Sequence, residues 1–358
     1  MVDRDRDLLA WAAGAVRQNF SGAKLGRVDA LRGDLSTRRF WRIHLKPGAS
    51  AASAILIDLG PDDLPGYARA LGLVPYPLDE PPWLTVQRFL LSLGIAVPAT
   101  YAVDRERRAM LVEDVGEVSL VDAVRRDPTE TADLFRSAVE LLLQFHVEGT
   151  RSISSDLLPA TIAYDARLFR WEFKEFLDLG CAELRADPNS LTPELDALTN
   201  ELGQFPRVFS HRDFHGQNLF VQSESAGMRL RVIDFQDALM GPAGQDLAVL
   251  MTTRDTATLI APSLEQRLLD FYYAGLTRRS AATLSMNDFI RSYRLCVLQH
   301  AIKMMGRFLM FERSGKQGYG AFVPYTIEQA RRILGGELGH DFPQLAQAFA
   351  ASGGAGAS

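Results

Sequence analysis

Three polar residues in the middle of the chain have the types and the spacing that phosphoryl transfer requires. Asp213 and Asn218 belong to an H-R-D-x-x-x-x-N segment, and Asp234 ends a short apolar run sixteen residues after the asparagine. A carboxylate can orient an attacking hydroxyl and accept its proton, while two further groups hold Mg²⁺ on the phosphates of ATP. We therefore predict that Asp213 is the catalytic base and that Asn218 and Asp234 bind Mg²⁺.

The residues between the asparagine and the second aspartate predict a β-hairpin. Residues 219–221 and 230–233 alternate or run apolar around a turn that contains Ser, Glu and Gly. Such a hairpin would place Asn218 and Asp234 at the same end of two paired strands, close enough to share an ion. A loop aspartate alone more often caps a helix, and a lone asparagine more often lies in a turn. The three residues at these spacings favour the catalytic interpretation.

This part of the chain resembles the aminoglycoside phosphotransferase/choline kinase family. The matching motifs are His211-Arg212-Asp213-Phe214-His215-x-x-Asn218, Ile233-Asp234-Phe235-Gln236-Asp237-Ala238, Gly241-Pro242 and Asp246-Leu247-Ala248. The resemblance is specific over residues 205–255 and extends, with weaker motifs, over most of the chain. It implies a kinase-like fold and ATP-dependent phosphorylation of a hydroxyl on a small molecule. It also implies that His211 and Asp246 support the catalytic loop, although Asp246 could instead cap the helix that it begins.

The composition is ordinary for a soluble globular protein and excludes several other classes. Hydrophobic residues make up 47% of the 358 residues and charged residues 23%, and the net charge is −5. The basic residues are dispersed, so nothing indicates a nucleic-acid partner. The charged amino terminus lacks a secretory apolar core, and no apolar run approaches the ~18 residues of a membrane span. We expect a cytoplasmic protein without a membrane partner, whose Cys181 and Cys296 are buried free thiols.

The resemblance implies an α+β, bilobal, protein-kinase-like fold, and the order of the predicted elements suits it. We expect a small N-lobe with an antiparallel sheet at 1–115, a larger and mostly helical C-lobe at 116–349, and a disordered tail at 350–358. The predicted strands are 27–31, 38–45, 53–59, 99–103 and 109–113. The predicted helices are 5–20, 83–93, 119–126, 131–147, 160–179, 193–202, 263–277, 286–311 and 326–334.

The N-lobe should contact the phosphates of the nucleotide. Residues 33–37 predict a turn in which Ser36 and Thr37 meet the phosphate oxygens, with an ordinary hairpin turn as the alternative. The third strand lacks the lysine that the broad family places there. Arginine is a competent phosphate ligand, so we predict that Arg38 or Arg39 takes this role, unless both face solvent.

Two further N-lobe segments bear on the nucleotide. Residues 110–116 resemble the family's inter-lobe hinge, which implies that the backbone of Glu113 and Val115 meets adenine; a plain core strand and turn is the alternative. Residues 60–82 contain six prolines, which preclude a continuous helix but allow a short one near 64–73. This proline-rich segment is either a flap near the nucleotide or a packed surface insertion.

Several stretches resemble one branch of the family, the anomeric kinases of N-acetylmuramate and N-acetylglucosamine in bacterial cell-wall recycling. They are Ser36-Thr37-Arg38-Arg39-Phe40-Trp41-Arg42, the lysine-free third strand, Val112-Glu113-Asp114-Val115-Gly116, Tyr164-Asp165-x-x-Leu168-x-x-x-Glu172-x-x-x-Phe176 and Ile302-Lys303-x-x-Gly306-x-Phe308. A sugar site would then be lined by residues of two predicted helices, namely Tyr164, Trp171, Glu172, Glu175 and Lys303. The indole suits stacking, the carboxylates suit hydroxyls, and the net-basic helix at 286–311 suits a sugar carboxylate. These positions are also compatible with ordinary core and surface residues.

We therefore predict an ATP- and Mg²⁺-dependent kinase of a small-molecule sugar. Two alternatives stay open at this point. The chain could phosphorylate another hydroxyl acceptor, such as an aminoglycoside or an amino alcohol. It could also be a nucleotide-binding pseudokinase, which the missing lysine favours and the intact Asp213, Asn218 and Asp234 oppose.

Overall fold

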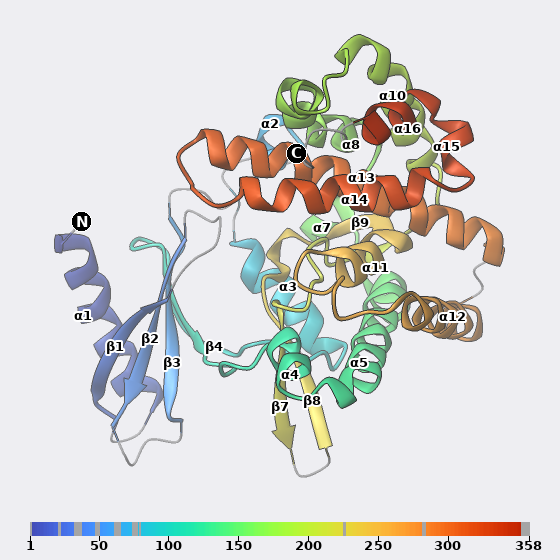
Figure 1. Cartoon of the computed structure of the whole chain (residues 1–358). Coiled ribbons are helices and arrows are strands. Elements are labelled where there is room, and N and C mark those ends of the chain that lie inside the picture. Colours follow the sequence, from blue (N-terminus) through green and yellow to red (C-terminus); the bar gives the residue numbers. More distant parts are fainter. Residues whose placement is uncertain are drawn as a thin grey trace.

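The computed structural model divides the chain into a small lobe with a β-sheet and a larger helical lobe (Figure 1). No helix in the described part of the chain is long and apolar enough to cross a membrane. The structure describes residues 2–20, 23–31, 38–46, 51–60, 66–73, 78, 80–224, 227–280 and 284–351.

The small lobe contains an antiparallel sheet whose five strands follow the order β1-β2-β3-β5-β4. Their bounds are β1 (Leu25–Leu31), β2 (Arg39–Leu45), β3 (Ser53–Asp58), β4 (Thr100–Asp104) and β5 (Ala109–Glu113). Helix α1 (Val2–Asn19) packs on this sheet, because Leu8, Ala12 and Val16 recur at helical spacing and form a small core with Ile43. These elements match the strands and the first helix predicted for the N-lobe.

The proline-rich segment contributes one short helix to the larger lobe. Helix α2 (Gly66–Ala70) lies within the range predicted for it, and its Tyr67 is buried in the core of the helical lobe. Figure 1 shows α2 beside the helical lobe rather than beside the sheet. The segment is therefore packed at this helix, whereas residues 61–65, 74–77 and 79 lie outside the described residues. Helix α3 (Pro82–Ser92) follows it.

Long α-helices build most of the larger lobe. Their bounds are α4 (Leu120–Arg126), α5 (Thr131–Leu143), α8 (Ala166–Glu172), α10 (Pro188–Leu202), α11 (Ala243–Thr252), α12 (Pro262–Arg279), α13 (Met286–Arg313), α14 (Val323–Leu334) and α16 (Pro343–Ala351). Shorter turns are η1 (Pro128–Glu130), η2 (Gln144–Gly149), α6 (Thr150–Ser152), α7 (Leu158–Thr161), η3 (Phe176–Gly180), α9 (Cys181–Glu183), η4 (Phe235–Asp237), η5 (Gly320–Phe322) and α15 (Leu338–Asp341). Helix α13 is central, and at Gly306 it approaches η3 so closely that an added Cβ would lie 2.3 Å from the Phe176 nitrogen. This approach explains why the chain has a glycine there.

The structure corrects two expectations about the helices. The helix predicted at 160–179 is broken into α7, α8 and η3, because Tyr164 donates its N–H to the Met240 carbonyl at 2.8 Å. The Asp165 carboxylate then accepts the N–H of Arg167 and of Leu168 and caps a new helix. Helix α16 was not predicted, and it includes the first two residues of the tail that was expected to be disordered. Residues 352–358 lie outside the described residues.

Candidate active site

Two antiparallel strand pairs present the predicted catalytic residues. Strand β6 (Arg207–Ser210) pairs with β9 (Leu239–Pro242) and leads into the H-R-D segment. Strand β7 (Leu219–Glu224) pairs with β8 (Gly227–Val232), as the sequence predicted. The two partners Leu219 and Val232 stand at one end of this hairpin, so Asn218 and Asp234 flank the same end.

The asparagine links the hairpin to the catalytic loop. Its Nδ2 donates to the Asp213 carbonyl at 2.9 Å and lies 3.5 Å from the carboxylate Oδ2 of the same residue. The backbone carbonyl of Asn218 accepts the N–H of Ile233 at 3.0 Å. The structure thus brings Asp213, Asn218 and Asp234 into one site. Their catalytic and metal-binding roles stay predictions.

The Asp246 carboxylate holds the loop from behind. This residue is fully buried and accepts hydrogen bonds from Ser210 Oγ, from the His211 N–H and from the Arg212 N–H, each at 2.7 Å. Burial acts to raise its pKa, but the hydrogen bond and charge of His146 lower the pKa overall. These contacts favour the predicted loop-supporting role over a simple helix cap.

His211 and His146 both form hydrogen-bond contacts inside the larger lobe. The His211 ring lies 3.0 Å from the Ile233 carbonyl through Nε2, and its Nδ1 accepts the Asp213 N–H at 3.3 Å. It therefore joins the loop to the hairpin that carries Asp234. His146 bridges Asp246 and the Tyr272 hydroxyl in the buried core, so its contacts there are structural.

Two non-glycine residues of the site adopt left-handed backbone conformations. Arg212 has φ of 75° and Asp234 has φ of 61°. Such a conformation costs on the order of 1–3 kcal/mol and persists where surrounding contacts determine it. For Arg212 those contacts are Asp246 at its N–H, Glu172 at its guanidinium, and the Tyr67 ring 4.1 Å from the guanidinium carbon. The next residue, Asp213, has an exposed side chain.

The Asp213 carboxylate is ionised and accessible. Burial of its surroundings acts to raise its pKa, but His215, whose Nε2 lies 3.6 Å from Oδ2, lowers the pKa well below the ordinary value. Conversely, burial lowers the pKa of His215 and the charge of Asp213 raises it, with a net rise. The Asp213 side chain keeps 51% of its surface exposed. It can therefore accept a hydrogen bond from an acceptor hydroxyl at neutral pH.

Glu172 lies behind the catalytic loop. Its fully buried carboxylate accepts from Arg212 Nη2 at 2.9 Å, from Gln299 Nε2 at 2.9 Å and from the Tyr164 hydroxyl. Lys303 Nζ lies 3.0 Å from it. Burial acts to raise the pKa of Glu172, yet Lys303 and Arg212 lower it to about 2. We call this set of side chains the Glu172 network.

These contacts show where the structure places the residues that were predicted to line a sugar site, and their role in sugar binding stays a prediction. Tyr164 and Glu172 are fully buried, so neither has surface to offer a ligand. Trp171 is partly buried against the edge of the Tyr67 ring, 6.4 Å between centroids, and Glu175 pairs with Arg307 at 3.5 Å. Tyr164 and Glu172 thus lie in the core of the larger lobe, whereas Trp171 and Glu175 stay partly exposed.

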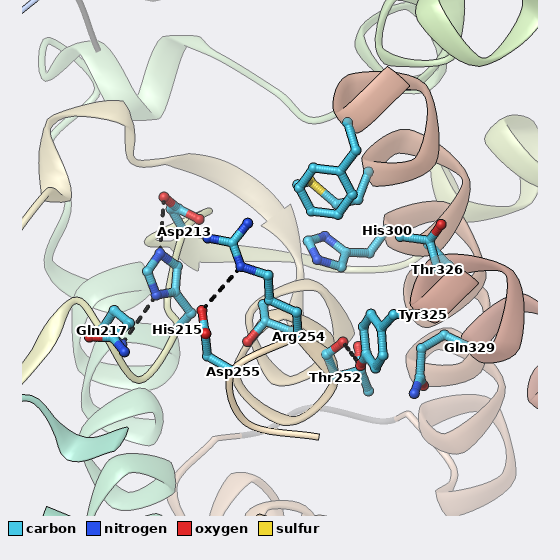
Figure 2. Close-up of a pocket in the computed structure, with 14 residues that line it drawn as sticks. Asp213, His215, Gln217, Thr252, Arg254, Asp255, His300, Tyr325, Thr326 and Gln329 are labelled. Carbon is cyan, nitrogen blue, oxygen red and sulfur yellow. Dashed lines mark hydrogen bonds and ion pairs between the residues drawn. The ribbon is translucent and has the colours of Figure 1, made fainter. Parts of the chain in front are cut away.

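A cavity of about 180 Å³ opens beside Asp213 on the helical side of the site (Figure 2). Its walls come from the catalytic loop, from the segment after α11, and from α13 and α14. The lining residues are Asp213, His215, Gln217, Thr252, Thr253, Arg254, Asp255, His300, Ala301, Met304, Phe308, Tyr325, Thr326 and Gln329. Most of them were not predicted as site residues, because they lie on segments far apart in the chain.

His300 gives this cavity a neutral imidazole. Burial lowers the pKa of His300, and the nearby charge of Lys303 lowers it further, to about 3. Its side chain can therefore donate or accept a hydrogen bond at neutral pH without a charge. Together with Gln329 and Tyr325 it offers polar atoms among the apolar Ala301, Met304 and Phe308.

The two candidate phosphate arginines point to different partners. Arg39 contacts Asp58 at 2.7 Å and Asp5 at 2.6 Å, and Arg4 of α1 contacts the same Asp58. Arg39 is thus part of the packing between α1 and the sheet. Arg38 of the small lobe instead contacts the larger lobe, since its Nη1 lies 3.4 Å from Asp234 Oδ1. Ser36 and Thr37 lie outside the described residues.

The predicted hinge is tied to the catalytic hairpin. Arg231 of β8 donates to both carboxylate oxygens of Glu113, at 2.5 and 2.6 Å, and Gln222 of β7 donates to the Val115 carbonyl at 3.1 Å. The Glu113 carboxylate also accepts the Ala99 N–H at 3.0 Å. The contact of this backbone with adenine stays a prediction.

A family comparison agrees with this geometry. The model of the phosphotransferase enzyme family matches residues 28–281, which include the sheet, the hinge and the catalytic loop. The chain belongs to this family. As a phosphotransferase it is an ATP-dependent kinase that acts on a hydroxyl group.

Curated relatives and solved structures add detail. An N-acetylmuramate/N-acetylglucosamine kinase of Pseudomonas aeruginosa is 29% identical over 279 residues, covering 74% of this chain and 78% of the relative. A protein of the same name from Caulobacter vibrioides is 27% identical, covering 83% and 85%. Choline kinase from Cryptosporidium parvum superposes with a TM-score of 0.62 at 12% identity, covering 95% of this chain and 99% of that chain. Aminoglycoside phosphotransferase APH(2'')-Ib gives 0.56 at 12% identity, covering 96% and 99%. The structural likenesses confirm the predicted bilobal, protein-kinase-like fold.

The donor set of this phosphotransferase fits Mg²⁺. In the described part of the chain no group of three or more His, Cys, Asp or Glu side chains is assembled for a metal. Mg²⁺ usually takes one or two protein oxygens, with water and substrate phosphates completing its shell. The Asn218 amide nitrogen faces the Asp213 carbonyl, which leaves the amide oxygen for a ligand, and the Asp234 carboxylate stands at the same hairpin end.

Proposed function

We propose that this phosphotransferase transfers the γ-phosphoryl group of ATP to the anomeric hydroxyl of an N-acetylated amino sugar, N-acetylmuramate or N-acetylglucosamine. The observation that carries the proposal is the ionised, exposed Asp213 carboxylate on the wall of a cavity that can hold the acceptor. The choice of sugar rests on four relatives named N-acetylmuramate/N-acetylglucosamine kinase, which are 26–29% identical to the chain. The reaction would serve cell-wall sugar recycling in the cytoplasm.

The proposed reaction does not require a strong base. The anomeric hydroxyl is the most acidic hydroxyl of a sugar, and phosphoryl transfer passes through a loose transition state. A carboxylate of low pKa can therefore orient the hydroxyl and receive its proton late in the reaction. Asn218 and Asp234 would hold Mg²⁺, which neutralises charge on the phosphates when bound. Arg38 would add a further positive charge at the same place.

The cavity suits an acetylated sugar better than a polycation. Its apolar residues, Ala301, Met304 and Phe308, offer contact area for a ring face or an acetyl methyl. Neutral His300 and Gln329 can meet amide and hydroxyl groups. An aminoglycoside would need a strongly acidic cleft to replace its hydration, and this cavity also contains the cation Arg254.

ADP release measured with a panel of acceptors tests this proposal. N-Acetylmuramate or N-acetylglucosamine should be turned over, whereas the methyl glycoside, which lacks the attacking hydroxyl, should bind without turnover. Phosphorus NMR should place the product phosphate on C1. Phosphate on C3 or C6 would contradict the anomeric assignment, and turnover of aminoglycosides or amino alcohols alone would contradict the sugar. Binding of Mg²⁺-ATP without ADP release for any acceptor would instead indicate a pseudokinase.

Alanine variants of the two arginines should separate the phosphate ligand from the structural residue. Loss of a charge-assisted phosphate contact costs about 1.5–3 kcal/mol, so Arg38→Ala should raise the KM for ATP, or lower its kcat/KM, roughly ten- to a hundredfold. Arg39→Ala serves as the matched control and should lower the melting temperature while ATP kinetics stay within about twofold. The reverse pattern would assign the phosphates to Arg39. Unchanged ATP kinetics in both variants would show that the phosphates are held in another way.

A further inference from the structure

One histidine of the catalytic loop was assigned no role by the motifs. His215 stands two residues after Asp213 and lines the cavity beside it. Figure 2 shows its ring between Asp213 and Gln217, with a dashed line to each of these residues. The ring therefore has one contact with the predicted base and one with the backbone of the loop.

The backbone contact determines which ring nitrogen of His215 carries a proton. The Gln217 N–H donates to Nδ1 at 3.2 Å, so Nδ1 acts as an acceptor. In the neutral ring the proton therefore sits on Nε2. An imidazolium carries a proton on Nε2 as well, so this nitrogen is a donor in both charge states.

The Nε2 donor faces one oxygen of the predicted base. Nε2 lies 3.6 Å from Asp213 Oδ2, and Asn218 Nδ2 lies 3.5 Å from the same oxygen. Among the described residues, no contact of the carboxylate falls on Oδ1. The distance to Nε2 is longer than that of a direct hydrogen bond, and contacts of catalytic groups often tighten only when the substrates are bound. The arrangement leaves Oδ1 for the acceptor hydroxyl.

The turn that carries both residues holds the ring in this position. The His215 N–H donates to the Asp213 carbonyl at 3.0 Å, and the His215 carbonyl accepts the Asn218 N–H at 2.9 Å. At Gly216 an added Cβ would lie 2.7 Å from Val121 Cγ2, so the turn packs tightly against α4. The His215 side chain keeps 24% of its surface exposed. The ring and the carboxylate are thus fixed to the same short turn.

We propose that His215 positions the base: its Nε2–H binds Asp213 Oδ2 and turns Oδ1 toward the acceptor hydroxyl in the cavity. Asn218 donates to the backbone carbonyl of Asp213, so His215 adds the contact that orients the carboxylate itself. His215 acts through Asp213 and is therefore a positioning residue. The inference rests on the proposed function, because it takes Asp213 as the base.

Two amide variants separate the roles of the two ring nitrogens. Glutamine places its amide near Nε2 and can still donate to Asp213, whereas asparagine places its amide near Nδ1 and can only accept from Gln217. His215→Asn should lower kcat roughly ten- to a hundredfold, with the KM for ATP within about threefold, because misplacement of a reacting group by about 1 Å can cost ~10²-fold. His215→Gln should keep kcat within about fivefold of the wild type.

The measurement is kcat with N-acetylglucosamine, or with the acceptor of the panel that the wild type turns over. Exposed His340 of α15 is the matched control, since His340→Asn makes the same change away from the site and should leave kcat unchanged. Titration with Mg²⁺-ATP and the melting temperature, determined on the same preparations, show that each variant is folded.

A purely structural role of the ring predicts the opposite order of the two variants. Asparagine would then keep kcat by accepting the Gln217 N–H and glutamine would lose it, which would overturn the proposal. Equal kcat in the two variants, whether lost or kept, would overturn it as well, and so would a loss of Mg²⁺-ATP binding in His215→Asn. A wild type that turns over no acceptor would refute the proposed function itself. An active wild type with an unimpaired His215→Asn would refute only the role of His215.

Discussion

Replacement of Asp213 by asparagine should lower kcat about 10²–10⁴-fold, the usual contribution of a positioned general base. The amide keeps the size of the side chain but can neither accept the proton nor share charge with His215, which lies 3.6 Å away. Binding of Mg²⁺-ATP should survive, because the predicted metal ligands Asn218 and Asp234 are unchanged. Steady-state turnover and nucleotide titration, done on the same preparation, separate the two effects.

An exposed aspartate outside the cavity is the matched control for this substitution. Asp133 lies on the exposed face of α5, so Asp133→Asn removes an equal charge without changing the cavity wall. We expect kcat of that variant to stay within about threefold of the wild type. Since the pKa of Asp213 is lowered below 3.8, the wild-type rate should show no loss from protonation of this residue at neutral pH. Turnover of Asp213→Asn within threefold of the wild type would remove Asp213 from the role of base.

The catalytic hairpin could be predicted because its geometry is local. Asn218 and Asp234 are separated only by two short strands and a turn, and the pairing of Leu219 with Val232 follows from that spacing alone. The fold class followed from the resemblance of these local motifs to a kinase-like family, and the order of the strands and the amphipathic helices suited it. Residue types near one another in the chain therefore carried most of the correct prediction.

The cavity beside Asp213 could not be predicted, because it depends on packing between distant elements. Arg254, His300 and Tyr325 belong to three segments that meet only when α11, α13 and α14 pack together. None of them stands in a motif that marks chemistry. The sequence instead pointed to one helix at 160–179, and the Asp165 cap that breaks it was a detectable signal that the helical periodicity concealed.

The choice between Arg38 and Arg39 shows a similar limit. Neighbouring residues at the edge of a strand point to opposite faces, so the two arginines could not both reach the same partner. The sequence did not indicate which face α1 would cover. In the structure Arg39 meets Asp5 of α1, and Arg38 is left on the side of Asp234.

Replacement of Glu172 by glutamine should lower the free energy of unfolding by about 3–5 kcal/mol, because it leaves two buried cations without their carboxylate. Arg212 and Lys303 contact Glu172 at 2.9 and 3.0 Å, and their side chains are each only 14% exposed. Glu175→Gln is the matched control from the following turn. Its partner Arg307 lies 3.5 Å away at a partly exposed site, where an ion pair contributes about 0–1 kcal/mol. Urea unfolding of both variants at pH 7 measures the difference.

The pH dependence distinguishes a charge effect from a packing effect in the Glu172 variant. The pKa of Glu172 is lowered from 4.5 to about 2 in the folded protein, so the unfolded chain takes up the proton first as the pH falls. The stability that the charge contributes is therefore fully present above about pH 4.5 and is lost toward pH 2. The difference in free energy of unfolding between the wild type and Glu172→Gln should narrow over that range, whereas a packing defect would keep it constant.

The Glu172 network should also affect catalysis, since Arg212 directly precedes Asp213. We expect Glu172→Gln to lose kcat and Glu175→Gln to keep it. Equal activity in the two variants would show that the Glu172 network does not position the catalytic loop.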